Sequence, residues 1–273
     1  MASCTNVSSA AGKQSGSTET LYAGTSGFSY STWKGTFYPP ALSGSKMLAY
    51  YAERLNGVEL NGSFYHTPPE STLLKWSSET PPEFRFCMKA NRGLTYSAEG
   101  FDRVGLARIL GERVAPLGER LGPIFLQFPP VRQKNVALLD SLLGALARRA
   151  AVEFRHVSWF DDETYRVLRE HDAALVVTDE EKWPRAPQVA IGSIAYFRLR
   201  RGYTDQTLRP WLAEVKSAVL THDDVHVYFK HDPESPSLAQ SLRALATGKE
   251  SAPRSARARP SAPKRAAPGG VRR

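Results

Sequence analysis

The sequence predicts an α/β fold, a closed (β/α)8 TIM barrel, over residues 20–247. Eight strand-like segments alternate with helix-like segments, which is typical of a parallel sheet. A chain of 273 residues is long for an average domain but ordinary for one α/β barrel. A doubly wound open sheet is the alternative, and it is less favoured because no glycine-rich phosphate loop opens the first strand and helix unit.

The strand candidates are short runs of apolar, aromatic and β-branched residues. In chain order they are 21–24, 57–61, 84–89, 123–128, 151–155, 173–178, 194–200 and 224–230. Most alternate between apolar and polar residues, as at 57–61, where Val58 and Leu60 share one face and Glu59 and Asn61 share the other. The apolar face of a barrel strand packs against the helices, so the polar face is expected to point into the barrel.

Between the strands, apolar residues recur with the spacing of amphipathic helices. The helix candidates are 45–55, 70–78, 102–121, 134–149, 161–171, 206–220 and, after the last strand, 235–246. The connection at 180–190 differs because it contains Pro184 and Pro187, which disfavour a helix interior. One helix position of the barrel is therefore predicted to be an irregular loop.

The composition and the first residues indicate the class of protein. The 41% hydrophobic and 23% charged fractions are ordinary for a soluble globular protein, and no apolar run is long enough to span a bilayer. Residues 1–19 are rich in Ser, Thr, Ala and Gly and lack the basic start and apolar core of a secretory signal. We therefore expect a disordered leader, a cytoplasmic location and no membrane partner.

The positive charge is concentrated at the end of the chain. The formal net charge is +9, and residues 248–273 contain eight basic residues and one acidic residue. This Pro, Ala, Ser and Arg segment has almost no large apolar side chain, so we predict a disordered basic tail. Such a tail can bind nucleic acid through phosphate contacts, and a merely solubilising terminus is the alternative.

Cysteine and metal signals are weak. Cys4 and Cys87 are the chain's two cysteines, which leaves no disulfide framework and no cysteine zinc motif. Oxygen and imidazole donors that would face the barrel rim are Glu59, Glu153, His156, Asp179, His231 and Asp232. Because their spacing does not establish convergence, a divalent metal is not favoured and the cofactor is left unknown.

The stretch at 152–162 carries the clearest functional signal. Val152 and Phe154 share the apolar face of a strand, while Glu153 and Arg155 share the face predicted to point inward. Two charges on the second face of a buried strand indicate a polar cavity, and structural ion pairs are the alternative. His156 follows the strand and is a candidate acid or base, or a residue that only hydrogen-bonds the turn.

The same alternation predicts a set of rim residues. Glu153, Glu59 and His156 are the candidate catalytic residues. Candidate substrate-binding residues are Arg155, Arg198, Arg200, Lys89, Asn61, Gln127, Lys230, Tyr30 and Trp159. Because cations outnumber carboxylates at this rim, the mouth is expected to favour an anionic ligand.

Several motifs occur together in one order. They include Gly24-Thr25-Ser26-Gly27-Phe28-Ser29-Tyr30, Val58-Glu59-Leu60-Asn61, Phe84-Arg85-Phe86, Gln127-Phe128-Pro129-Pro130 and Glu153-Phe154-Arg155-His156. In these motifs the chain resembles the YecE-like family, the domain of unknown function 72, from about Leu21 to about Leu245. The resemblance implies a TIM barrel and implies no established reaction. Where the family reads Tyr-x-Arg-Leu-His-Gly, this chain has Tyr196-Phe197-Arg198-Leu199-Arg200-Arg201-Gly202.

Three functional interpretations remain open. The first is an enzyme of hydrolase or isomerase class that acts on an anionic, phosphate-bearing or sugar-like substrate, with Glu153 as general base and Arg155 and Arg198 as anion clamps. The second is a nucleic-acid-binding or nucleic-acid-processing barrel that uses the basic mouth and tail. The third is a non-catalytic ligand-binding barrel. The sequence does not predict the oligomeric state.

Overall fold

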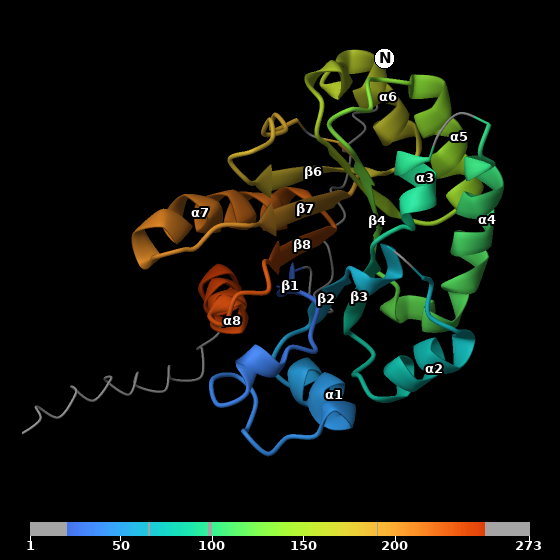
Figure 1. Cartoon of the computed structure of the whole chain (residues 1–273). Coiled ribbons are helices and arrows are strands. Elements are labelled where there is room, and N and C mark those ends of the chain that lie inside the picture. The colour runs from blue at the N-terminus through green and yellow to red at the C-terminus, as the bar shows by residue number, and fades with distance from the viewer. Residues whose placement is uncertain (1–20, 65, 98–99, 190, 249–273) are drawn as a thin grey trace, which may run out of the picture.

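The computed structural model describes residues 21–64, 66–97, 100–189 and 191–248 (Figure 1). The predicted leader at 1–19 and the predicted tail beyond its first residue lie outside the described residues. None of the helices in the described part of the chain has both the length and the apolar character needed to cross a membrane.

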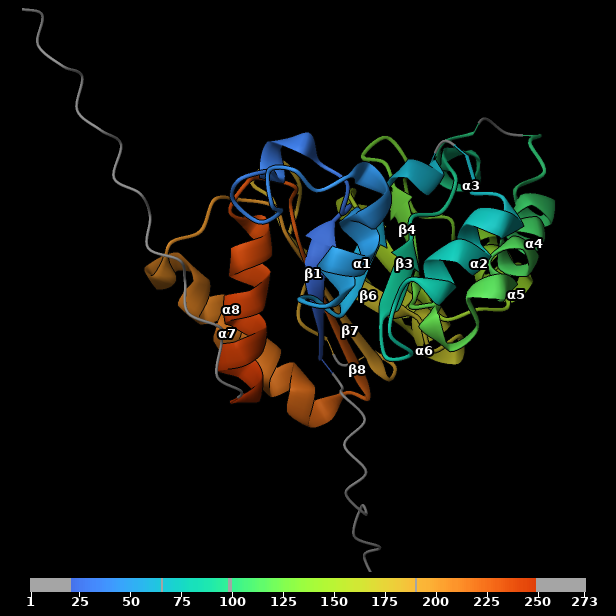
Figure 2. The same ribbon diagram turned by 90° about the horizontal axis from the view of Figure 1, so that it is seen from below.

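Eight parallel strands form one sheet. They are β1 Leu21–Ser26, β2 Gly57–Leu60, β3 Arg85–Met88, β4 Ile124–Phe128, β5 Ala150–Phe154, β6 Ala174–Asp179, β7 Ile194–Leu199 and β8 Asp224–Phe229. Their order in the sheet is β3-β2-β1-β8-β7-β6-β5-β4. Consecutive strands are therefore neighbours, except that β3 and β4 lie at the two ends of this order, and the sheet curls into a barrel that brings these ends together (Figures 1 and 2). The predicted (β/α)8 barrel is confirmed.

The barrel closes between β3 and β4 through a few backbone contacts. Ala90 N donates to Phe125 O at 2.8 Å, and Gly122 N donates to Phe86 O at 3.0 Å. A methyl group added at Gly122 would lie 2.7 Å from Cys87 Sγ, so a residue without a side chain is needed at this seam. The seam joins strands that otherwise share isolated bridges rather than a continuous ladder.

The helices cover the outside of the barrel (Figure 2). They are α1 Met47–Ala52, α2 Glu70–Ser78, α3 Arg92–Tyr96, α4 Arg103–Arg113, α5 Val136–Leu146, α6 Asp162–Glu170, α7 Asp205–Thr221 and α8 Ser235–Thr247. Side chains that accept a backbone N–H in the first turn fix the starts of several helices, as Asn135 does for α5, Asp161 for α6 and Thr204 for α7.

Two connections depart from a regular strand and helix alternation. The helix predicted at 102–121 was too long, because α4 ends at Arg113 and a 3-10 segment, Ala115–Arg120, follows with Pro116 in its first turn. Between β6 and β7 the described residues contain no helix, which confirms the predicted irregular loop.

Two apolar cores lie on the two faces of the sheet. The outer core lies between strands and helices and includes Leu126, Val152 and Phe197. The inner core fills the barrel and contains Cys87, Phe125, Ala151, Ala174, Val176, Ile194, Tyr196 and Tyr228. Successive residues of the strands therefore point alternately to the helices and into the barrel, as the sequence predicted. At the C-terminal ends of the strands, beyond the inner core, polar side chains point into the barrel.

Candidate active site at the C-terminal end of the barrel

Arg198 on β7 joins two carboxylates from other strands. Its Nε and Nη2 donate to the two oxygens of Glu59 on β2 at 2.8 and 2.9 Å. Its Nη1 donates to Oε2 of Glu153 on β5 at 2.6 Å. All three side chains are buried, with Arg198 only 2% exposed. One guanidinium therefore holds two carboxylates in fixed positions inside the barrel.

Glu153 receives four hydrogen bonds in this arrangement. Besides Arg198, its donors are Gln127 Nε2 at 2.6 Å, Arg155 Nε at 2.7 Å and Thr178 Oγ1 at 2.8 Å. Burial alone would raise the pKa of Glu153, but the charges of Arg198 and Arg155 lower the pKa well below its ordinary value. This carboxylate is ionised, and its lone pairs are occupied.

Glu59 is held in the same way. Ser26 Oγ donates to Oε1 at 2.9 Å, Asn61 Nδ2 donates to the same oxygen at 3.2 Å, and Tyr196 Oη donates to Oε2 at 3.0 Å. Burial would raise the pKa of Glu59, but Arg198, followed by Arg200 and Lys89, lowers it to about 2. Both carboxylates are therefore counter-ions of a cationic cluster.

Lys89 and Arg200 add two further cations to the cluster. Lys89 Nζ donates to Gln127 Oε1 at 2.9 Å, and Arg200 Nη1 donates to Ser26 Oγ at 2.8 Å. Burial and the neighbouring charge of Arg198 lower the pKa of Lys89 to about 8. The same two causes lower the pKa of Arg200. The site thus carries more positive charge than its buried carboxylates neutralise.

A hollow of about 1050 Å³ lies beside Arg200. It is bounded by residues 179–182 after β6, residues 200–203 after β7, and the first turns of α7. Arg201 also lines it, but this arginine pairs with Asp179 at 2.8 Å and Glu181 at 2.7 Å. Arg200 makes no such ion pair within the described residues.

Aromatic residues of the loop after β1 lie next to the cluster. Tyr30 Oη donates to the backbone oxygen of Ser26 at 2.7 Å, and the Tyr30 ring stacks on His231 with centroids 5.2 Å apart. Trp33 Nε1 donates to His231 O at 3.3 Å, which ties this loop to the segment after β8. Tyr30 therefore lies beside the ends of β1 and β8, and its role in binding stays a prediction.

Several predicted site residues lie elsewhere or act differently. Trp159 was predicted to line the mouth, but it is 0% exposed and packs against Phe154, with ring centroids 4.5 Å apart, on the outer side of the barrel. The prediction for Trp159 was wrong because its ring completes the outer core. Arg198 was predicted as an anion clamp, but its bonds to Glu59 and Glu153 occupy its guanidinium.

His156 and Lys230 are not joined to the cluster by any contact found among the described residues. His156 Nδ1 accepts from Ser158 N at 3.2 Å and bonds Ser158 Oγ at 2.8 Å, which fixes the turn before α6. The nearest carboxylate to Lys230 Nζ is Asp232, at 3.7 Å. The arrangement thus gives His156 the turn-stabilising role that the sequence left open.

Three hydroxyl groups of the cluster were not selected from the sequence. Ser26, Thr178 and Tyr196 each donate to a buried carboxylate. The sequence could have identified Thr178, because alternation along β6 places it on the same inward face as Ala174 and Val176. Trp183 was also missed as a partner of Arg155, whose guanidinium carbon lies 5.0 Å from the ring centroid.

Within the part of the chain that the structure describes, no group of three or more His, Cys, Asp or Glu side chains is placed to hold a metal ion. The oxygens of Glu59 and Glu153 face guanidinium, amide and hydroxyl donors. The donor set considered in the sequence therefore does not converge on one point among these residues.

Comparisons with known proteins give a family and no reaction. The family model described as "Protein of unknown function DUF72" matches residues 22–265. A solved DUF72 family protein from Thermotoga maritima is 30% identical, with a TM-score of 0.71 over 85% of this chain and 98% of its own. One from Enterococcus faecalis is 21% identical, with a TM-score of 0.64 over 84% and 96%, and supports the fold alone.

Curated relatives are similar over shorter stretches. UPF0759 protein YunF of Bacillus subtilis is 30% identical over 58% of this chain and 59% of its own length. UPF0759 protein YecE of Escherichia coli is 33% identical over 43% of this chain and 44% of its own length. The matches thus span about half the length of these relatives.

Proposed function

From the premise that the chain belongs to the DUF72 family of proteins of unknown function, we propose that it is an enzyme acting on a small anionic substrate. The substrate class is phosphate-bearing or sugar-like. The site is the C-terminal end of the barrel, where enzymes of this fold place their chemistry. The proposal rests on the residues of this chain.

The observation that carries the proposal is the position of Arg200. Its side chain is half-buried, bonds the neutral Ser26 Oγ at 2.8 Å, and lies between the Arg198 cluster and the open hollow. Partial burial of a guanidinium that makes no direct ion pair within the described residues costs free energy, and an anion entering from the hollow would offset that cost. Lys89 and Arg155 lie in the same electrostatic cluster and would add to the attraction.

Lys89 is a better candidate than Glu153 for moving a proton. Glu153 already accepts four hydrogen bonds, so it lacks the free lone pair and the basicity that a general base needs. Lys89 reaches the cluster from the end of β3, and its pKa of about 8 lets it exchange a proton near neutral pH. We assign Glu59 and Glu153 the role of fixing Arg198, and Lys89 the role of acid or base.

Deuterium exchange into phosphorylated sugars tests this function without knowledge of the product. Dihydroxyacetone phosphate and ribulose 5-phosphate are incubated with the protein in D2O and followed by proton NMR. Wild-type protein should speed loss of the carbon-bound proton next to the carbonyl, and Lys89→Met should abolish this. Lys75→Met, on the exposed surface of α2, is the matched control.

Three results would count against parts of this proposal. Equal exchange by wild type and Lys89→Met would remove Lys89 from the chemistry. Saturable binding of these phosphates with no exchange would favour the non-catalytic ligand-binding barrel instead. Absence of both binding and exchange would overturn the proposal for this substrate class.

A further inference from the structure

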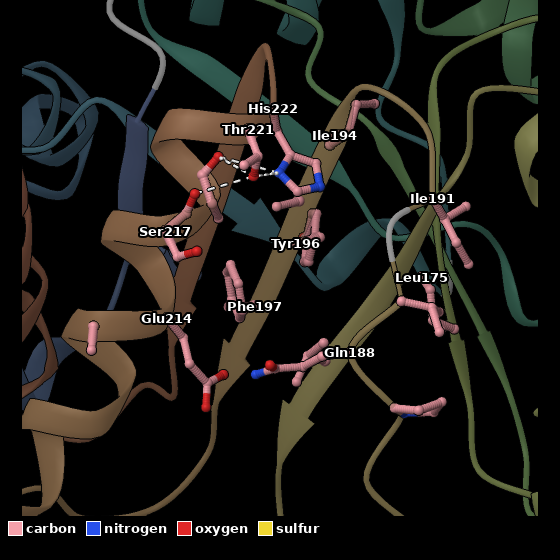
Figure 3. Close-up of a pocket in the computed structure, with 16 residues that line it drawn as sticks. Leu175, Gln188, Ile191, Ile194, Tyr196, Phe197, Glu214, Ser217, Thr221 and His222 are labelled. Carbon is pink, nitrogen blue, oxygen red and sulfur yellow. Dashed lines mark hydrogen bonds between the residues drawn. The ribbon is translucent and has the colours of Figure 1, made fainter.

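A second cavity lies on the outside of the barrel, where the helix between β6 and β7 is replaced by a loop. It has a volume of about 420 Å³ and lies between the outer face of these strands, residues 187–189 and Ile191 of the loop, and α7 (Figure 3). Arg198 and Phe197 are neighbours on β7, so the cavity and the Arg198 cluster lie on opposite faces of one strand. Tyr196, whose hydroxyl donates to Glu59, borders both, but Glu59, Glu153, Arg198 and Arg200 do not line the cavity, which is therefore distinct from the proposed anion site.

The cavity has an apolar floor, and apolar and polar residues share its walls. Leu175, Val177 and Phe197 form its floor, and Val189 and Ile191 contribute from the loop. Eight of the sixteen lining residues are buried. A cavity with such a lining gains free energy when an apolar molecule replaces water in it.

The loop that forms one wall is fastened to α7. Arg185 Nη2 donates to both oxygens of Glu214 at 2.8 and 2.9 Å. The Arg185 guanidinium also lies 4.6 Å from the centre of the Trp211 ring. These contacts shape the cavity before any ligand enters, and they occupy the carboxylate that would otherwise attract a cation.

One end of the cavity carries a polar group that can recognise a ligand. His222 Nδ1 bonds the backbone oxygen of Ala218 at 3.2 Å and Thr221 Oγ1 at 2.9 Å. A carbonyl oxygen accepts only, so in the tautomer whose Nδ1 donates to Ala218 O, Nε2 is an acceptor. Figure 3 places the His222 ring at the opposite end of the cavity from Gln188 and Glu214.

We propose that this cavity binds a small, uncharged, largely apolar molecule whose single hydrogen-bond donor meets Nε2 of His222. Its volume falls within the roughly 300–1,000 Å³ of small-molecule sites. A protein partner fits less well, because a stable interface buries about 800 Å² per partner. Sixteen lining residues, half of them buried, expose less than that.

N-phenyl-1-naphthylamine is a suitable probe, because it is neutral, has one N–H donor and fluoresces in apolar surroundings. Titration of the full chain should give saturable binding of one probe per molecule. Ala213→Trp fills the cavity from the exposed face of α7 and should weaken binding at least tenfold. Lys216→Trp, on the same helix but outside the lining, should leave binding unchanged.

A second comparison isolates the polar contact. His222→Leu should weaken N-phenyl-1-naphthylamine several-fold but leave 1-phenylnaphthalene, which lacks the N–H, unchanged. Arg200→Gln should alter neither, because Arg200 serves the other site. Absence of saturable binding, or equal affinity in Ala213→Trp and wild type, would overturn the proposal. If His222→Leu weakens the binding of both probes equally, the ligand's hydrogen-bond donor is not recognised by His222, and that part of the proposal fails.

Discussion

Arg198 and Glu153 are hydrogen-bonded across the barrel, with Arg198 Nη1 2.6 Å from Glu153 Oε2. The same guanidinium holds Glu59, so one side chain on β7 links β2 and β5. β5 and β6 pair only over Ala151 and Val152, and beyond these residues the bonds to Glu153 from Thr178 and Arg198 connect this part of the barrel. The cluster is thus structural as well as electrostatic.

Removal of Arg198 should be costly. Arg198→Met leaves two buried carboxylates without their shared partner, and breaking a buried pair in this way costs about 3–5 kcal/mol. Urea unfolding measures the loss. Arg166→Ala is the control, because its pair with Glu170 is exposed and contributes at most about 0.5 kcal/mol. A loss below about 1 kcal/mol in Arg198→Met would contradict the structural role.

Glu59 should contribute to stability in a defined pH range. Its pKa is lowered from 4.5 to about 2 by the cationic cluster, so its contribution is fully present above pH 4.5 and is lost as the pH falls towards 2. Glu59→Gln should lower the free energy of unfolding at pH 7. The decline of that free energy between pH 4.5 and about 2 should also be smaller in the variant than in wild type. Unfolding in urea at several pH values checks this, and an unchanged acid slope in Glu59→Gln would contradict it.

The seam between β3 and β4 should be sensitive to one methyl group. Gly122→Ala places a methyl 2.7 Å from Cys87 Sγ and should destabilise the barrel by about 1–3 kcal/mol. Cys87→Ala removes that sulfur, so the double variant should lose less than the two single changes together. Gly62→Ala, whose methyl would meet no atom within 4 Å, is the control. If the double variant loses as much free energy of unfolding as the two single variants together, the contact with Cys87 does not limit closure of the barrel.

Anion affinity should depend on the protonation of Lys89. Its pKa is about 8, so its charge is present below that pH and is lost as the pH rises through it. Sulfate affinity should therefore fall several-fold between pH 7 and 9, because sulfate keeps its own charge in this range. Lys89→Arg should remove this dependence. Calorimetry at each pH supplies the measurement, and a parallel decline in both proteins would assign the titration to another group.

The fold could be predicted because its signals are local and repeated. Alternation on β2 places Glu59 inward in the sequence and in the structure. The end of α4 could not be placed as well, because one Pro116 in a helical pattern leaves open whether the helix bends or stops. The missing helix after β6 was visible because two prolines occur close together there.

The sequence predicted which residues belong to the site but not which of them pair with one another. Alternation identified Glu59, Glu153 and Arg198 as inward residues, but it could not say that one guanidinium would bind both carboxylates. That pairing depends on barrel radius and strand stagger, which a single sequence does not encode locally. Trp159 shows the same limit, since aromatic residues after a strand occur both at mouths and in outer cores.

The most direct test of the account is calorimetric titration of inorganic phosphate into wild type, Arg200→Gln and Arg201→Gln. The two arginines are neighbours beside the same hollow, but Arg201 is paired with Asp179 and Glu181. Phosphate should bind wild type saturably, and its affinity should fall at least tenfold in Arg200→Gln and stay within about twofold in Arg201→Gln. No binding to wild type, or equal affinity in wild type and Arg200→Gln, would contradict it.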